Sequence, residues 1–340
     1  ARGDVDCGLS GTVMRFVPPL AALADAAVGF DGDTRAHARP MAGLLHALRA
    51  LDVTVSPDDA TGLPFTVHGA GQVVGGTVEV DARESSQYVS GLLMAGCRFA
   101  DGLRLHAVGV PPSTPHITMT VETMRARGLD VAQPTPTTWT VRPGVASGGD
   151  VTVEPDLSNA APFLAAALAT GGVVRVPGWP EHTTQPSDEL LHLLGRLGAE
   201  VVAEGGALTL SGPETITGLG RTDMSSVGEL VPTIVALAAL ADSETIITGV
   251  AHLRGHETDR LAALSRALRA LGGRVAETDD GVHVTPTPLH GGTVATEGDH
   301  RMATFAAILG LAVTGVAVDD VSVTTKTMPD FPRRWQAMLA

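Results

Sequence analysis

Residues 10–24 read SGTVMRFVPPLAALA, with small polar residues first and then a long run of alanine, leucine and valine. The same design occurs four more times, and the starts of neighbouring copies are 68–75 residues apart. The other copies are residues 85–96 (SSQYVSGLLMAG), 158–170 (SNAAPFLAAALAT), 226–241 (SVGELVPTIVALAALA) and 299–313 (DHRMATFAAILGLAV). Each copy predicts a buried helix that is capped by Ser or Asp and apolar on nearly all faces.

A second pattern follows each of the first four copies. An amphipathic helix ends at a small or polar turn and leads into strand-like stretches that predict a hairpin. These helices start near residues 44 (LLHALRAL), 120 (TVETMRAR), 190 (LLHLLGRL) and 263 (ALSRALRAL), and one strand is Val282–Thr285. The repeating order is therefore helix, strand, helix, strand, strand over about 70 residues, which is longer than a solenoid repeat and favours compact multi-unit domains.

The repeats divide the chain unevenly. The composition changes at Gly144–Asp150 (GVASGGD), where small residues predominate. We therefore predict a first domain over residues 1–148 with two repeats and a second over residues 149–340 with three. The fifth repeat ends with a helix over residues 330–339 and no hairpin, so we expect strands from outside this sequence to complete it. The sequence begins at Ala1 rather than Met, and we expect further sequence upstream.

The composition argues against several classes of protein. The formal net charge of −14 argues against binding to nucleic acid, whose phosphates need a basic face. No uninterrupted apolar run reaches the roughly 18 residues that a membrane span needs. Cys7 and Cys97 make no disulfide framework and have no partner at metal-ligand spacing, so we expect core positions in a reducing, cytoplasmic setting. Small anions stay possible, because a few arginines in a cleft can outweigh a distant acidic surface.

Three of the five helix starts carry groups that suit an anion. A helix N-terminus presents unpaired N–H groups and about half a positive charge. Gly11–Arg15 combine close backbone access with an arginine, Ser85–Gln87 offer two hydroxyls and an amide, and Asp299–Arg301 add a second guanidinium. Singly these are ordinary caps, but five aligned starts favour an anion-binding cleft. Lys326, the single lysine among 23 lysines and arginines, is a further candidate cation.

These stretches resemble, in order and over the whole chain, the 3-phosphoshikimate 1-carboxyvinyltransferase (EPSP synthase) family of enolpyruvyl transferases. Gly8–Arg15 (GLSGTVMR) is similar to the family segment GNAGTxxR, with Leu9 and Ser10 in place of Asn-Ala. The other similar segments are Asp33–Pro40 (DTRAHARP, for RxxxRP), Ser85–Gln87 (SSQ), Pro112–His116 (PSTPH), His256–Leu261 (HETDRL, for KETDRL), Asp299–Met302 (DHRM) and Thr325–Asp330 (TKTMPD). The family's opening strand and its Lys-Ser…Arg segment have no counterpart here, so the resemblance implies a missing N-terminal segment.

The resemblance implies an α/β (α+β) fold of two like domains built from βαβαββ units, with the active site in a cleft between them. It implies a transferase that moves the enolpyruvyl group of phosphoenolpyruvate to the 5-hydroxyl of shikimate 3-phosphate and releases phosphate, in the synthesis of chorismate and aromatic amino acids. No metal or organic cofactor is implied. The implied partners are these two small molecules, with no nucleic acid and no membrane, and the implied state is a cytoplasmic monomer.

The resemblance also implies roles for individual residues. Those on phosphoenolpyruvate are Gly11, Arg39, Gln87, Arg260, Arg301 and Lys326. Those on shikimate 3-phosphate are Ser85, Ser86, Gln87, Ser113, Glu229 and His256. The implied catalytic residues are Glu229 as base on the hydroxyl, Glu257 as proton carrier to the methylene carbon, and Lys326. At His256 and Glu229 many members of the family carry Lys and Asp, although actinobacterial-type members are similar in both places.

Two alternatives stay open. A UDP-N-acetylglucosamine enolpyruvyl transferase shares the fold but would carry a reactive loop cysteine, whereas Cys7 and Cys97 flank the first two predicted buried helices. A non-catalytic relative that only binds ligands would be expected to have lost site residues, whereas Glu229, Glu257, Arg301 and Lys326 are all present.

Overall fold

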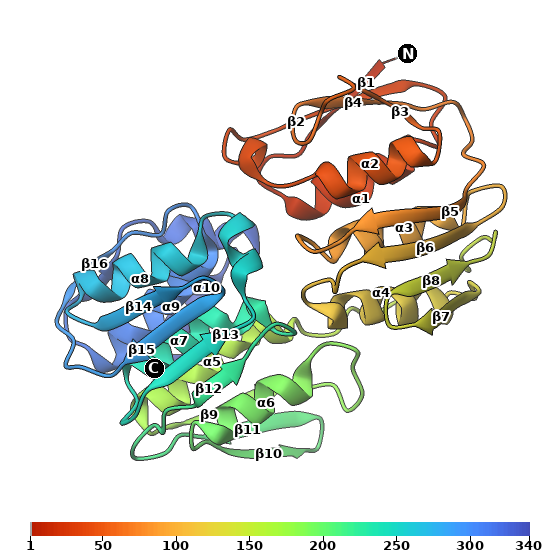
Figure 1. Ribbon diagram of the computed structural model, residues 1–340. Coiled ribbons are helices and arrows are strands. Elements are labelled where there is room, and N and C mark those ends of the chain that lie inside the picture. The colour runs from red at the N-terminus through yellow and green to blue at the C-terminus, as the bar shows by residue number, and fades with distance from the viewer. Residues whose placement is uncertain (1) are drawn as a thin grey trace. The chain divides into compact units, whose positions relative to one another are not determined.

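The computed structural model describes residues 2–340, which form two compact units (Figure 1). The first unit contains the residues up to Val151 together with Gly255–Glu257, and the second contains Thr152–Arg254 and Thr258–Ala340. Each unit has its own core of buried apolar side chains. No helix within the described residues is both long and apolar enough to cross a membrane.

The first unit holds two copies of the repeat, each a four-stranded sheet with two helices. The first copy is β1 (Arg2–Asp6), α1 (Gly11–Ala21), β2 (Ala27–Asp31), α2 (Ala42–Ala50), β3 (Thr54–Ser56) and β4 (Phe65–His68). The second is β5 (Gly76–Asp81), α3 (Gln87–Gly96), β6 (Leu103–Val108), α4 (Thr114–Ala126), β7 (Val131–Thr135) and β8 (Thr138–Val141). The sheet orders are β1-β2-β4-β3 and β5-β6-β8-β7. In both, the first two strands are parallel, and the buried helix makes the crossover that a parallel pair requires.

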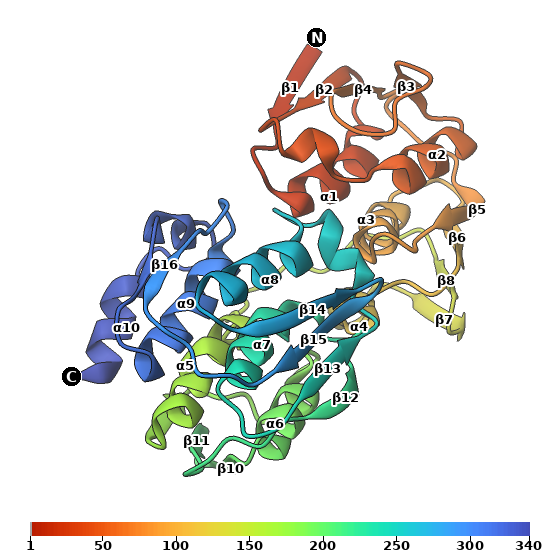
Figure 2. The same cartoon turned by 60° about the vertical axis from the view of Figure 1, so that its left-hand side comes forward.

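The second unit holds three copies. The complete one is β12 (Gly220–Asp223), η2 (Gly228–Leu230), α7 (Val231–Ala239), β13 (Thr245–Thr248), η3 (Ala251–Gly255), α8 (Arg260–Ala270), β14 (Arg274–Thr278) and β15 (Gly281–Thr285). The last copy is β16 (Gly292–Val294), α9 (His300–Ala312), β17 (Val316–Val318), η4 (Val321–Lys326) and α10 (Phe331–Leu339). The sheet orders are β12-β13-β15-β14 and β16-β17. The three long apolar helices α5, α7 and α9 pack against one another (Figure 2).

The third repeat differs from the others in its first strand. It contains α5 (Leu157–Thr170), β9 (Val173–Pro177), α6 (Ser187–Arg196), β10 (Glu200–Glu204) and β11 (Ala207–Ser211), in a sheet of order β10-β11-β9. Residues 152–154 stand where the other copies have a first strand, but they form none, and Val153 is 86% exposed. Within residues 2–340, β9 is therefore an edge strand that pairs with β11 alone.

The predicted helix caps are confirmed at two starts. Ser10 accepts a hydrogen bond from the N–H of Val13 at α1, and Asp299 accepts one from the N–H of Arg301 at α9. At α3 the accepting hydroxyl belongs to Ser85, which receives the N–H of Gln87 at 3.2 Å.

The predicted caps of the other two helices are wrong. α5 is capped by Asp156, whose carboxylate accepts both the N–H of Asn159 and the hydroxyl of Ser158, so this serine lies inside the first turn. α7 begins only at Val231, after the turn η2, because a proline in its first turn needs no hydrogen-bonded N–H. Ser226 therefore lies before the helix.

Candidate active site

Helices α1 and α3 bring the first group of predicted residues together. In α3, a Cβ on Gly91 would clash with the carbonyl oxygen of Arg15, so glycine allows the two helices to pack closely. Arg15 Nη1 donates a 2.9 Å hydrogen bond to Gln87 Oε1 and so joins the two helix starts. Ser85 and Ser86, directly before Gln87, are 7% and 5% exposed. The donors of two helix N-termini are thus held beside buried hydroxyls, an arrangement that suits an anion.

Two buried guanidiniums lie beside Gly11, the first residue of α1. Arg15 and Arg39 are 4% and 6% exposed, and Arg39 Nη1 donates to the carbonyl of Leu9 at 3.0 Å. Burial first, and the charge of Arg39 second, lower the pKa of Arg15 to about 10. A bound anion would stabilise the charged forms of these two buried arginines, which repel each other. We call Gly11, Arg15, Arg39 and Gln87 the first-unit cluster.

Gly11→Ala is expected to weaken phosphoenolpyruvate binding about tenfold or more and to leave the fold intact. The added methyl would meet only the ends of two flexible side chains, Arg39 Nη2 at 2.6 Å and Arg15 Nη1 at 3.0 Å. These ends can move. A displaced Arg39 would lose hydrogen bonds worth about 1.5–3 kcal/mol to the anion, and a displaced Arg15 would lose its bond to Gln87. The measurement is calorimetric titration beside a thermal melt. Gly91→Ala is the control, because its methyl would meet backbone and should lower the melting temperature. Unchanged affinity in Gly11→Ala would contradict the assignment.

Ser113 lies at the start of α4, which packs against α3. Its backbone is left-handed, with φ 50° and ψ 47°, and the residue is 8% exposed. A serine pays strain for this conformation, and such strained positions cluster at functional sites. The geometry is consistent with a role for this serine in ligand binding.

A second group is built around Arg260, the first residue of α8, which is 1% exposed. Its Nε donates to Asp299 Oδ2 at 2.7 Å, its Nη2 to Asp299 Oδ1 at 3.4 Å and its Nη1 to Glu229 Oε2 at 2.9 Å. Glu229 lies in η2, directly before the buried helix α7. Its Oε2 is also 2.7 Å from Arg301 Nε. We call Glu229, Arg260, Asp299 and Arg301 the second-unit cluster.

Asp299 orients the side chain of Arg260, caps helix α9 and is fully buried. Its side chain pairs with Arg260, and its Oδ1 accepts the backbone N–H of Arg301. Arg301 Nη2 reaches Ser158 Oγ at 3.3 Å. The sequence identified Asp299 only as a helix cap, because its partner Arg260 is 39 residues away and no local pattern signals that contact. Ser158 was likewise assigned only as a cap.

The remaining predicted residues lie outside these two clusters. Lys326 is exposed at the end of η4, which packs against α9. His256 and Glu257 are half-buried between η3 and α8, and they group with the first unit. The structure thus brings Gly11, Arg39 and Gln87 together around the side chain of Arg15. Arg260 and Arg301 both contact Glu229.

Neither cysteine has the surroundings of a reactive thiol. Cys7 is 3% exposed, and burial with the charges of Asp6 and Asp31 raises its pKa to about 11. Burial also raises the pKa of Cys97. A nucleophilic cysteine needs the opposite shift.

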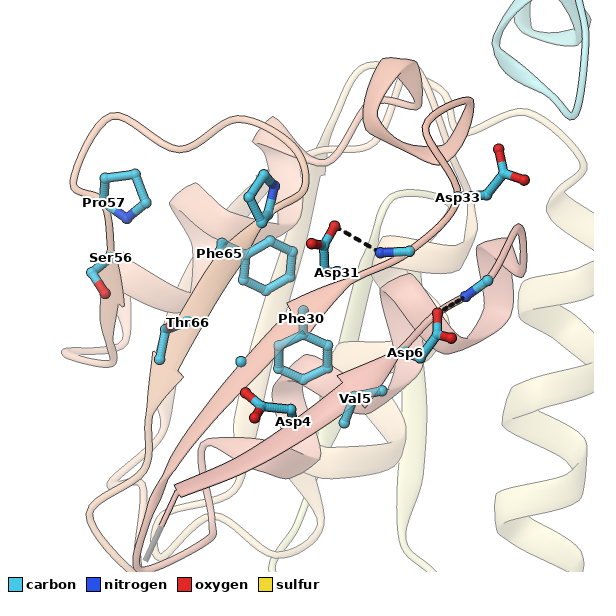
Figure 3. Close-up of a pocket in the computed structure, with 14 residues that line it drawn as sticks. Asp4, Val5, Asp6, Phe30, Asp31, Asp33, Ser56, Pro57, Phe65 and Thr66 are labelled. Carbon is cyan, nitrogen blue, oxygen red and sulfur yellow. Dashed lines mark hydrogen bonds between the residues drawn. The ribbon is translucent and has the colours of Figure 1, made fainter.

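A hollow of about 920 Å³ lies over strands β1, β2 and β4 (Figure 3). Four aspartates line it, and none of the predicted site residues does. Two of them, Asp6 and Asp31, accept hydrogen bonds from the N–H groups of Gly8 and Gly32 (Figure 3). The negative charge of these aspartates repels an anionic ligand, so this hollow is a poor candidate for the site.

Comparison with known proteins gives one consistent result. A family model described as EPSP synthase (3-phosphoshikimate 1-carboxyvinyltransferase) matches residues 2–335. A curated 3-phosphoshikimate 1-carboxyvinyltransferase of Kocuria rhizophila is 54% identical over 337 residues, which are 98% of this chain and 76% of that protein.

Two solved structures of EPSP synthase from Acinetobacter baumannii, one of them at 2.37 Å resolution, have the same fold. Their TM-scores are 0.80 and 0.77 at 23% and 22% identity. Each similarity covers 99% of this chain and 79% of the other.

Proposed function

The chain belongs to the EPSP synthase family, and on that premise we propose that it transfers the enolpyruvyl group of phosphoenolpyruvate to the 5-hydroxyl of shikimate 3-phosphate. The products are 5-enolpyruvylshikimate 3-phosphate and phosphate. The observation that carries the proposal is the 54% identity to a curated 3-phosphoshikimate 1-carboxyvinyltransferase over 98% of the chain. The proposed setting is a cytoplasmic monomer.

The two clusters supply the groups that such a reaction requires. Both substrates are anions, so binding needs cations and backbone donors rather than an apolar pocket. We assign Gly11, Arg39 and Gln87 of the first-unit cluster to phosphoenolpyruvate, and with them Arg260, Arg301 and Lys326. To shikimate 3-phosphate we assign Ser85, Ser86, Gln87, Ser113, Glu229 and His256. The support for the arginine assignments is the burial of Arg39 and Arg260 and the position of the two clusters at the starts of α1 and α9.

In the proposed mechanism, Glu229 removes the proton of the 5-hydroxyl as its oxygen bonds to C2 of phosphoenolpyruvate. Glu257 gives a proton to C3, and phosphate leaves as C3 loses a proton again. Arg260 and Arg301 hold Glu229 through one carboxylate oxygen, Oε2. The carboxylate of phosphoenolpyruvate would compete with Glu229 for the same two guanidinium groups. Binding of this substrate would therefore free the base to reach the hydroxyl.

The alternative acceptor, UDP-N-acetylglucosamine, fits the chain less well. Enzymes of that kind are expected to use a reactive loop cysteine, and both thiols here are buried with raised pKa values. The decisive assay follows phosphate release from phosphoenolpyruvate with either acceptor and identifies the product by mass. Phosphate release with shikimate 3-phosphate as the acceptor, and none with the UDP-sugar, supports the proposal. Release with the UDP-sugar would replace it, and binding without release would indicate a non-catalytic relative.

His256 is expected to make the KM for shikimate 3-phosphate depend on pH. An imidazole is ordinarily charged only below about pH 6.5–7, and a phosphate binds the charged form better. The KM should therefore rise as the pH increases through this range. In His256→Lys the side chain stays charged, so the rise should flatten. Parallel kinetics from pH 5.5 to 8.5 on the two proteins make the comparison, and identical profiles would remove His256 from the site.

A further inference from the structure

Arg15 is a buried arginine whose hydrogen-bond acceptors are all neutral. Its Nη1 donates to Gln87 Oε1 at 2.9 Å and its Nη2 to the carbonyl of Pro40 at 3.2 Å. The guanidinium carbon lies 5.6 Å from the centre of the Tyr88 ring, and the Tyr88 hydroxyl donates to the same Pro40 carbonyl at 2.6 Å. In the part of the chain that the structure describes, Arg15 forms no ion pair with a carboxylate. Within residues 2–340, the only carboxylate that acts on its pKa is Glu257, and this attraction is the smallest of the causes, whereas burial is the largest. A charge buried with so little compensation is unusual unless a ligand uses the arrangement.

The contact with Gln87 decides how this amide is oriented. A guanidinium has five N–H donors and no acceptor, so the amide atom that faces it has to be the oxygen. An amide and its flipped form differ little in shape, and only such a neighbour distinguishes them. With Oε1 turned to Arg15, the NH₂ group of Gln87 is directed away from the arginine and is left to donate. An amide that presents its NH₂ group binds an anion, and one that presents its oxygen repels it.

The contact with Pro40 positions Arg39, the second residue that we assign to the anion. Pro40 directly follows Arg39, and its carbonyl accepts hydrogen bonds from both Arg15 and Tyr88. This segment of backbone is therefore fixed next to Arg39, whose guanidinium lies beside Gly11.

We infer that Arg15 is a positioning residue for phosphoenolpyruvate, because it locks Gln87 in the donating orientation and anchors the backbone next to Arg39. It acts through these two residues and not on the substrate. This inference rests on the proposed function, in which Gln87 and Arg39 bind phosphoenolpyruvate.

A double-mutant cycle tests the inference with Arg15→Met, Gln87→Ala and the combined variant. The measurements are the KM for phosphoenolpyruvate, its affinity by calorimetry, and the melting temperature. We expect Arg15→Met to raise the KM about 10- to 100-fold, as for a lost hydrogen bond to a charged group. In the Gln87→Ala background the same change should have a clearly smaller effect, because much of the role of Arg15 passes through Gln87. Fully additive effects, or an unchanged KM in Arg15→Met, would overturn the inference.

Two further variants keep the test decisive if Arg15→Met folds poorly. Arg15→Lys still carries a donor within reach of Gln87 and should recover much of the affinity. Gln87→Glu should pair with Arg15 and raise the melting temperature, yet weaken phosphoenolpyruvate binding by presenting a carboxylate. The opposite result in either variant would refute the positioning role.

The matched control is Arg49→Met, since Arg49 donates only to backbone carbonyls in the same unit. It should lower the melting temperature without changing the KM. A wild-type protein that releases no phosphate would refute the proposed function. The calorimetric affinities for phosphoenolpyruvate would still test the role of Arg15 separately.

Discussion

Lys326→Met is expected to lower kcat about 100-fold or more while changing the free energy of unfolding by less than about 0.5 kcal/mol. The side chain is exposed at the end of η4, so its loss leaves no cavity. A positioned cation that meets the charge developing in the transition state contributes far more to rate than to folding. Steady-state kinetics and thermal melts on the same preparations measure the two effects.

Arg333→Met is the matched control for this experiment. Arg333 is an exposed cation in the following helix, and it pairs with Asp330 at 2.7 Å on the surface. It should change neither the rate nor the stability appreciably. A kcat near that of the wild type in Lys326→Met would remove this lysine from the catalytic group.

Arg260→Met is expected to have the largest effect on stability, lowering the free energy of unfolding by about 3–5 kcal/mol. The reason is Asp299, a fully buried carboxylate that would lose its guanidinium partner. Activity should fall as well, because phosphoenolpyruvate would lose one of the arginines that we assign to it. Urea denaturation measures the stability, and Arg266→Met in the same helix is the control. Its pair with Glu297 is largely exposed and is expected to contribute about 1 kcal/mol or less.

The double variant Arg260→Met with Asp299→Leu separates stability from function. Replacing both partners of a buried ion pair with apolar side chains is often neutral for folding. We therefore expect most of the stability to return, less about 1 kcal/mol for the lost cap of α9. Activity should stay low. Recovery of activity together with stability would show that Arg260 has only a structural role.

Much of the fold could be predicted from sequence because its repeats are strongly patterned. The long apolar runs predicted the buried helices α1, α3, α5, α7 and α9, and the amphipathic segments predicted the helices that follow them. The caps were harder to predict, because Asp156 and Ser158 are both good cap residues and only the three-dimensional hydrogen bonds decide between them. Residues 152–154 alternate like a strand, but a strand also needs a partner, and pairing depends on tertiary structure.

The candidate site shows the same limit. Lys326 could be singled out by composition, and Arg15 and Arg301 by their position at predicted helix starts, since both signals are local. Arg39 and Arg260 were identified only through the family resemblance. The bond between Arg15 and Gln87 joins residues 72 apart, and that between Arg260 and Asp299 joins residues 39 apart. Sequence spacing contains no information on such contacts. The partners of the arginines therefore had to come from the structure.

The open edge of β9 has a consequence for solubility. An unpaired strand presents a row of N–H and C=O groups that another chain can extend into a shared sheet. β9 reads VVRVP, and without its charge it would be an apolar strand of high β-propensity. Arg175 places a charge at its centre, and Pro177 removes an N–H at its end. We expect these two residues to oppose edge-to-edge aggregation at the one edge of β9 that is unpaired within residues 2–340.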